Sequence, residues 1–212
     1  LEPKVLLLDE PLASLDRKVR KELQTELKRI QQEVGITFFY VTHDQKVALA
    51  ISDTIAVMRA GRLEQIGSPE EIYSTPRTKF IADFMGAVNI FLGRVIAGGG
   101  EVYLESEGGL RIVALDKKDV PGEKTSISVH PEMIDVSLID TDLKRDNSFK
   151  GRIVGMIYQG DFIELKIRLL NDKSSKLITV HLSSMLAQKL EPSVGKKVLV
   201  QWDKESSNLL QG

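Results

Sequence analysis

Two apolar runs flank a long amphipathic segment near the start of the chain. Val5–Leu8 and Ile36–Val41 are continuous apolar or β-favouring runs followed at once by polar residues, which is typical of parallel strands buried on both faces. Between them, Asp16 and Gly35 are suited to the N-cap and the C-terminal stop of a helix. Strand, helix and strand in this order predict a βαβ crossover with parallel strands. The apolar positions of the helix are spaced four, four, three and four residues apart: Val19, Leu23, Leu27, Ile30 and Val34.

The predicted elements after this crossover are shorter. Residues 45–51 predict a short helix, and Thr54–Met58 and Arg62–Ile66 flank the turn residues 59–61, which indicates a hairpin. Residues 68–71 read Ser-Pro-Glu-Glu, a capping box with proline at the first helical position. We therefore expect another helix there and a further helical piece that ends at Gly86.

Past Gly86 the texture of the sequence changes. Short segments rich in Val and Ile alternate with turns rich in Gly, Asp, Asn and Ser, which predicts a small all-β barrel or sandwich. Gly93-Arg94-Val95 and Gly151-Arg152-Ile153 each open a long strand, a weak sign of two related halves. The expected strands are 90–96, 101–105, 110–114, 125–129, 151–158, 162–169, 177–182 and 197–202. The fold class expected is therefore an incomplete α/β domain, residues 1–86, followed by an all-β domain, residues 87–212.

Composition narrows the functional classes. The 212 residues contain 29 Lys and Arg against 30 Asp and Glu, a formal charge of -1, which disfavours a nucleic-acid binder or a membrane anchor acting through a general basic field. The absence of cysteine excludes a disulfide framework and a Cys-ligated zinc site. No apolar run is long enough to span a bilayer. Because the chain opens on a strand without an initiating Met, we expect it to be the C-terminal part of a longer protein.

Acidic residues and a histidine follow the two predicted parallel strands. Asp9 and Glu10 end the first, and His43 follows the second, so all three are expected at the sheet edge where open α/β sheets bind ligands. There Asp9 would hold Mg²⁺ through water, Glu10 would accept a proton from an attacking water, and His43 would contact a γ-phosphate. An Asp-Glu pair in an ordinary loop and a structural histidine are the alternatives, which the shared edge makes less favoured.

These segments resemble the motifs of ABC-type ATPases. Leu6–Pro11 is similar to the Walker B strand with its catalytic Glu, residues 12–16 to the D-loop, and residues 41–44 to the switch-histidine motif. The resemblance covers residues 1 to about 86. It implies Asp9 as the Mg²⁺ residue, Glu10 and His43 as catalytic residues, and Asp16 as the D-loop residue that faces a partner subunit near bound ATP.

Two departures from the family limit what this chain can do. Ala13-Ser14 replaces the usual Ser-Ala order, which puts in doubt a D-loop hydroxyl at position 13. The sequence also contains no Gly-x-x-x-x-Gly-Lys-Ser/Thr phosphate loop, no Gln loop and no Leu-Ser-Gly-Gly-Gln signature. We therefore expect the chain by itself to bind ATP negligibly and to be inactive.

Further residues resemble the importer branch of the family. Residues 62–73 are similar to the hairpin and helix that close the nucleotide domain of importers, and the β tail is similar to their TOBE domain, an oligonucleotide-binding-like barrel. His130 stands where that domain usually has Arg, and is expected to be a solvated turn residue. The resemblance to the spermidine/putrescine group rests on residues 84–86, 89–91, 158–161 and 198–202.

The resemblance implies a parent protein that couples ATP hydrolysis to solute uptake. Its expected partners are a second copy in a homodimer, transmembrane permease subunits and, indirectly, an extracytoplasmic solute-binding protein, at the cytoplasmic face of the membrane. Its cofactors would be ATP and Mg²⁺. Nucleic acid is disfavoured, since core packing is expected for the tail's aromatics, Phe91, Tyr103, Phe149, Tyr158, Phe162 and Trp202. The alternatives are a non-catalytic TOBE-bearing regulatory module, an importer ATPase for iron, a sugar or an oxyanion, and a DNA-linked ABC ATPase head.

Overall fold

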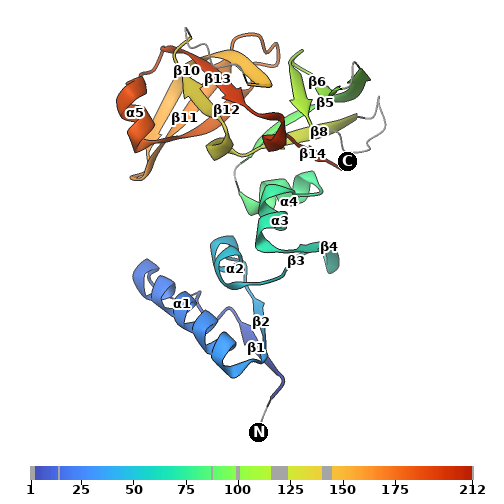
Figure 1. Ribbon diagram of the computed structural model, residues 1–212, viewed down its shortest axis with the longest axis vertical. Helices are drawn as coiled ribbons and strands as arrows, with labels where there is room; N and C mark the ends of the chain where they lie inside the picture. The colour runs from blue at the N-terminus through green and yellow to red at the C-terminus, as the bar shows by residue number, and fades with distance from the viewer. Residues whose placement is uncertain are drawn as a thin grey trace. The chain divides into compact units, whose positions relative to one another are not determined.

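A computed structural model describes residues 3–13, 15–86, 88–98, 101–115, 124–139 and 145–211 (Figure 1). The chain divides into two compact units, Leu1–Thr75 and Pro76–Gly212. No helix within the described ranges combines the length and the apolarity that crossing a membrane requires.

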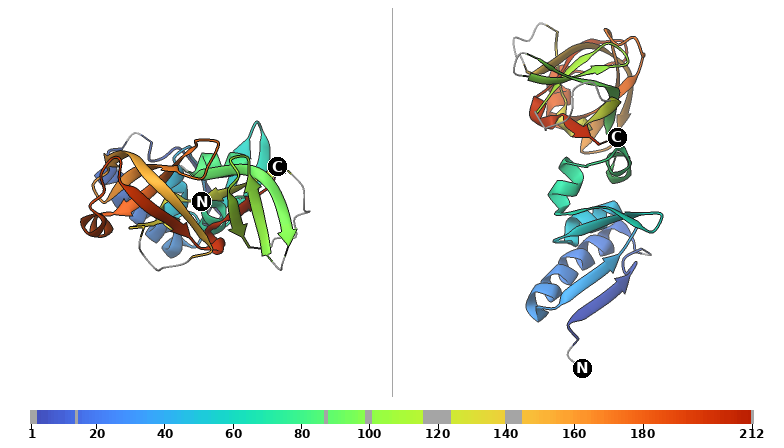
Figure 2. Two further views of the ribbon diagram at one scale, coloured as in Figure 1. Left: turned by 90° about the horizontal axis from the view of Figure 1, so that it is seen from above. Right: turned by 90° about the vertical axis from the view of Figure 1, so that its right-hand side faces the viewer.

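The first unit begins with the predicted crossover. Strand β1 (Val5–Asp9) pairs in parallel with β2 (Thr37–Val41), and helix α1 (Arg17–Val34) connects them (Figure 2, right). The Asp16 carboxylate accepts hydrogen bonds from the amides of Lys18 and Val19, and Gly35 ends the helix in the left-handed conformation with φ +68°. The predicted crossover, cap and stop are all confirmed.

The remainder of the first unit is a short helix, a hairpin and another short helix. Helix α2 (Gln45–Ile51) precedes the antiparallel strands β3 (Ile55–Arg59) and β4 (Arg62–Gly67), and α3 (Pro69–Ser74) follows. Both turn residues, Ala60 and Gly61, have positive φ, as a two-residue hairpin turn requires. The capping box forms between Ser68 and Glu71. These predictions are confirmed.

The burial predicted for the parallel strands is not found. Val5 is 57% exposed, Leu7 67% and Phe39 56%. Parallel strands are buried when further strands and helices cover both faces of their sheet, whereas among the described residues β1 and β2 are paired only with each other. A small core lies elsewhere in the unit: Leu12, Val47 and Ile51 are buried, and Leu15, Leu27 and Tyr40 pack against them.

The second unit is mostly β structure, arranged as two five-stranded antiparallel sheets (Figure 1). Their orders are β14-β8-β5-β6-β7 and β12-β11-β10-β13-β9. The first sheet contains β5 (Asn89–Gly98), β6 (Glu101–Ser106), β7 (Arg111–Ala114), β8 (Lys124–Val129) and β14 (Asn208–Leu210). The second contains β9 (Asp135–Ser137), β10 (Asn147–Tyr158), β11 (Phe162–Leu169), β12 (Leu177–Ser183) and β13 (Lys197–Trp202).

One apolar core is shared by the two sheets. Leu104 and Ile127 of one sheet and Ile167 and Trp202 of the other belong to the same buried cluster. The Gly-Arg repeats do not open their strands as predicted: Gly93 and Gly151 are each the fifth residue of their strand, β5 and β10, and each of these strands lies at the centre of a sheet. Both repeat glycines are closely packed: a Cβ at Gly93 would lie 2.1 Å from the Glu105 carbonyl oxygen, and one at Gly151 would lie 2.5 Å from the Ile167 side chain.

Several short elements were not predicted. They are helix α5 (Ser184–Leu190) and, among segments of three residues that are too short to show a period, strands β9 and β14 and the 3₁₀ turns η1 (Pro131–Met133) and η2 (Lys204–Ser206). Helix α4 (Lys79–Met85) lies within the predicted α/β segment, residues 1–86, but in the structure it belongs to the unit that contains the β sheets. The reason is packing: Ala82 of α4 is buried with Ile90 and Leu210.

Candidate functional site

The structure places Asp9, Glu10 and His43 at one end of the β1–β2 pair. Asp9 is the last residue of β1 and lies opposite Val41, the last residue of β2. The Glu10 amide donates to the Val41 carbonyl at 2.8 Å, so the backbone pairing of the two strands extends to the residue after β1. His43 follows two residues later. Parallel pairing therefore brings together residues that are 33 positions apart.

Glu10 and His43 form a direct pair. The Nδ1 atom of His43 lies 2.7 Å from Oε1 of Glu10, and the two side chains are 77% and 42% exposed. The hydrogen bond between His43 and the Glu10 carboxylate is the main cause that raises the pKa of His43, and the negative charge of Glu10 is the second. A carboxylate beside an accessible imidazole can accept, hold or return a proton, which is the chemistry of general acid–base catalysis.

The backbone at Glu10 is strained. Its φ is +44°, in the left-handed region that L residues rarely adopt. Such strain costs on the order of 1–3 kcal/mol and persists only where surrounding contacts enforce it. Here the contacts are the Glu10 amide on Val41 and the Ala13 amide, which donates to the Glu10 carbonyl at 3.2 Å. The turn sets the direction in which the Glu10 carboxylate leaves the strand.

Asp16 lies apart from this pair. Its Oδ1 atom accepts from the amides of Lys18 at 2.9 Å and Val19 at 3.0 Å. The Asp16 carboxylate thus binds its own helix. Among the described residues, no hydrogen bond is formed by its Oδ2 atom. Ser14, of the reversed D-loop pair, lies outside the described residues.

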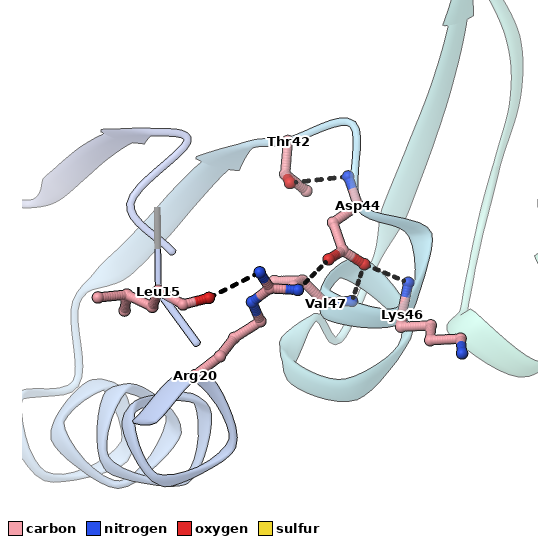
Figure 3. A network of polar contacts seen from close by, with 6 residues as sticks. All are labelled: Leu15, Arg20, Thr42, Asp44, Lys46 and Val47. Carbon is pink, nitrogen blue, oxygen red and sulfur yellow. Dashed lines mark hydrogen bonds and ion pairs between the residues drawn. The ribbon is translucent and has the colours of Figure 1, made fainter. Parts of the chain in front are cut away.

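Sequence reasoning missed one network beside the site. The Arg20 guanidinium donates to the Leu15 carbonyl at 2.9 Å and to the Asp44 carboxylate at 3.0 Å (Figure 3). Asp44 in turn caps α2 by accepting from the amides of Lys46 and Val47. The cap could have been found, since Asp44 directly precedes a predicted helix. The ion pair could not, because it joins residues 24 positions apart with no periodic signal.

A pocket of about 190 Å³ adjoins the site, lined by Pro11, Leu12, Ala13, Arg20, Tyr40, Thr42, His43, Asp44 and Val47. Ligand pockets are usually about 300–1,000 Å³, so this one is small for a nucleotide. No cluster of three or more His, Cys, Asp or Glu side chains among the described residues is arranged to hold a metal ion. A single carboxylate such as Asp9 still suits Mg²⁺, which keeps several waters and takes further oxygens from a phosphate substrate.

Two expectations for the second unit are wrong. His130 is only 7% exposed, since it directly precedes the η1 turn, which packs against β12; its Nδ1 atom lies 3.8 Å from the Glu132 carboxylate. Tyr158 is 73% exposed, since it ends β10 at the hairpin to β11 and lies beyond the buried core. Phe91 and Trp202 do pack in the core, with their rings stacked 6.0 Å apart.

The chain matches known proteins over both units. Residues 127–210 match the TOBE domain family. The spermidine/putrescine import ATP-binding protein PotA of Trichormus variabilis is 43% identical over 80% of this chain and 45% of its own length. PotA 2 of Pseudomonas aeruginosa is 40% identical over 99% of this chain and 58% of its own length. The chain thus spans about half the length of the curated relatives it matches.

A solved structure shares the fold of the β unit. The cytoplasmic molybdate-binding protein ModG, with molybdate bound, superimposes with a TM-score of 0.50 and 17% identity over 57% of this chain and 94% of its own. At that identity the likeness concerns the fold alone.

The matches confirm the resemblance inferred from the sequence: this chain carries a TOBE domain and is related, over most of its length, to the ATP-binding subunits of ABC importers of the spermidine/putrescine group.

Proposed function

We propose that this chain is part of the ATP-hydrolysing subunit of an ABC importer, with residues 1–86 belonging to its nucleotide-binding domain and residues 87–212 forming a regulatory TOBE-like domain. The observation that carries the proposal is the 2.7 Å pair between Glu10 and His43 at the end of two parallel strands. ATP hydrolysis requires a base for water and a donor toward the phosphate, and this pair supplies both groups.

Each candidate residue has a distinct role in this proposal. Asp9 would hold Mg²⁺ through water, and the ion would neutralise phosphate charge. The Glu10 carboxylate would accept the proton of the attacking water, and His43 would donate a hydrogen bond from its imidazole to the γ-phosphate. In the described structure these two side chains bind each other, so both must exchange this contact for substrate contacts. Asp16, at the start of α1, would lie at the contact with a second copy.

The exposed strands favour a larger domain around this site. Leu7 and Phe39 leave apolar side chains in solvent, where parallel strands are normally covered. We infer that, in the parent protein, further nucleotide-domain structure covers them and provides the phosphate loop that this sequence lacks. The 212 residues alone would then bind ATP negligibly. Titration calorimetry with Mg-ATP checks this, and an affinity in the low micromolar range would contradict it.

The transported solute is proposed from the relatives. Their printed names give spermidine and putrescine, so we propose polyamine uptake, driven by a homodimer of the subunit bound to membrane permease subunits at the cytoplasmic face. A solute-binding protein outside the membrane would deliver the polyamine.

Substitution of Glu10 in the full-length subunit tests the proposed chemistry. Glu10→Gln keeps the shape of the side chain but removes the base, so hydrolysis should be lost while an ATP-bound dimer accumulates. Glu33→Gln on the exposed surface of α1 is the matched control and should hydrolyse ATP at the wild-type rate. His43→Ala should slow hydrolysis by about 10²-fold or more, as loss of a transition-state contact does. Normal turnover in Glu10→Gln would contradict the proposal.

A further inference from the structure

Arg20 joins two segments that each carry a candidate functional residue. Its Nη2 donates to the carbonyl of Leu15, the residue before Asp16, and its Nη1 donates to the carboxylate of Asp44, the residue after His43 (Figure 3). The guanidinium suits this task because its donors project in a rigid planar fork. One side chain therefore connects the loop before α1 to the start of α2.

The Asp44 carboxylate passes this connection to the first backbone amides of α2, and the Asp44 amide is bonded to the Thr42 side chain. Its Oδ1 accepts from the amides of Lys46 at 3.0 Å and Val47 at 3.2 Å, and its own amide donates to the Thr42 hydroxyl at 3.0 Å. The Oδ2 atom remains for Arg20. The backbone around His43 is thus held through Asp44, while the imidazole itself is largely exposed and bonded to Glu10.

The environment favours this ion pair over others on the same helix. The Arg20 and Asp44 side chains are 32% and 30% exposed, whereas Arg29 of α1, which pairs with Glu26 and Glu33, is 53% exposed. Partial removal of water strengthens charge interactions, and fully solvated pairs contribute little. Arg29 therefore serves as a matched control for the loss of an α1 guanidinium.

We propose that Arg20 is a positioning residue that couples the D-loop to His43. By joining the Leu15 carbonyl to Asp44, it makes the loop that carries Asp16 and the segment that carries His43 move together when a second copy of the subunit docks. This rests on the proposed ATPase function. Arg20 touches no reacting group in this arrangement, so its contribution is to the rate of hydrolysis once ATP is bound. Displacement of a catalytic group by about 1 Å can cost up to about 10²-fold in rate.

The test compares steady-state ATP hydrolysis by full-length subunits carrying Arg20→Met, Arg20→Lys or Arg29→Met. Arg20→Met should lower kcat about tenfold or more with little change in KM, because a positioning contact acts after binding. Arg20→Lys keeps the charge without the fork and should recover part of the rate. Arg29→Met should match the wild type.

A double-mutant cycle isolates the Arg20–Asp44 contact. Asp44→Asn removes the charge but keeps a good N-cap, so its loss of kcat should not add to that of Arg20→Met. Amide hydrogen exchange at Lys46 and Val47 should become faster in Arg20→Met and stay unchanged in Arg29→Met. A wild-type subunit without ATPase activity would overturn the proposed function and this inference with it. If the wild type is active, two results would overturn the inference alone. One is a kcat of Arg20→Met equal to that of Arg29→Met. The other is a double mutant in which the kcat losses of Arg20→Met and Asp44→Asn multiply.

Discussion

Apolar strand residues are buried in the β unit but largely exposed on the β1–β2 pair of the α/β unit. In the β unit, strand residues such as Leu104, Ile127 and Trp202 have no exposed surface. In the α/β unit, Leu7 and Phe39 on paired parallel strands are more than half exposed. The sequences of both sets of strands favour β structure, so the difference lies in what surrounds them. Ten strands in two sheets cover each other, and two strands beside one long helix do not.

This contrast extends to what holds the candidate site together. The Glu10 turn, the Asp16 cap and the Arg20–Asp44 bridge are polar contacts in partly or largely exposed surroundings. The β unit is stabilised instead by a continuous apolar core. Burial of apolar surface is the dominant favourable contribution to folding, so the two units should respond differently to the same kind of substitution.

The largest difference is expected for leucine truncation. Leu104→Ala in the β core should destabilise the chain by about 2–5 kcal/mol, since it removes buried methyl groups and leaves a cavity. Leu7→Ala on the exposed β1 strand should change stability by about 0.5 kcal/mol or less. Urea unfolding checks this, with Trp202, the single tryptophan, reporting on the β unit and far-UV circular dichroism on the helices. Equal shifts for the two variants would contradict the contrast in burial.

A smaller effect is expected from the helix cap of the α/β unit. Asp16→Ala removes the acceptor for the amides of Lys18 and Val19 and should cost about 1 kcal/mol of helix stability. Asp16→Asn retains an acceptor and is the control. The helical circular dichroism signal should melt earlier in Asp16→Ala alone, while Trp202 fluorescence stays unchanged. A cap variant without effect on α1 would show that the Asp16 cap does not stabilise this helix.

The smallest effects on stability are expected from the titration of His43 and His181. The Glu10 carboxylate raises the pKa of His43, whereas burial, as the main cause, lowers the pKa of His181 in the β unit. The pair of His43 and Glu10 therefore contributes its full stability at pH values below the pKa of His43 in the unfolded chain, about 6.5. This contribution is lost as the pH rises through the raised pKa of His43 in the folded chain. For His181 the sign is reversed, and stability falls as the pH drops below about 6.5 through the lowered value.

Nuclear magnetic resonance titration of the imidazole signals measures both shifts. Glu10→Gln should bring the pKa of His43 down toward its ordinary value and leave His181 unchanged. A His43 pKa that does not respond to this substitution would contradict the 2.7 Å pair on which the candidate site is built.

Much of the local structure was predictable because its signals are local. The caps at Asp16 and Ser68, the turn at Ala60 and Gly61 and the long strands all follow from residue type and spacing. The exposure of Leu7 and the burial of His130 were not, because both depend on which distant segments pack nearby. The proximity of Asp9, Glu10 and His43 was accessible through one topological rule, that parallel strands end at a shared edge.

The sequence by itself determined the order of the long helix and the long strands and the change from α/β to β texture, and it indicated the candidate residues for the acid–base and magnesium chemistry proposed above. Tertiary structure alone decided that Glu10 and His43 bind each other, that Arg20 connects Leu15 to Asp44, and that α4 packs with the β sheets. The physical reason is the sequence separation over which each kind of interaction acts. Capping, turn formation and periodicity act over a few residues, whereas ion pairs and burial depend on segments that only folding brings into contact.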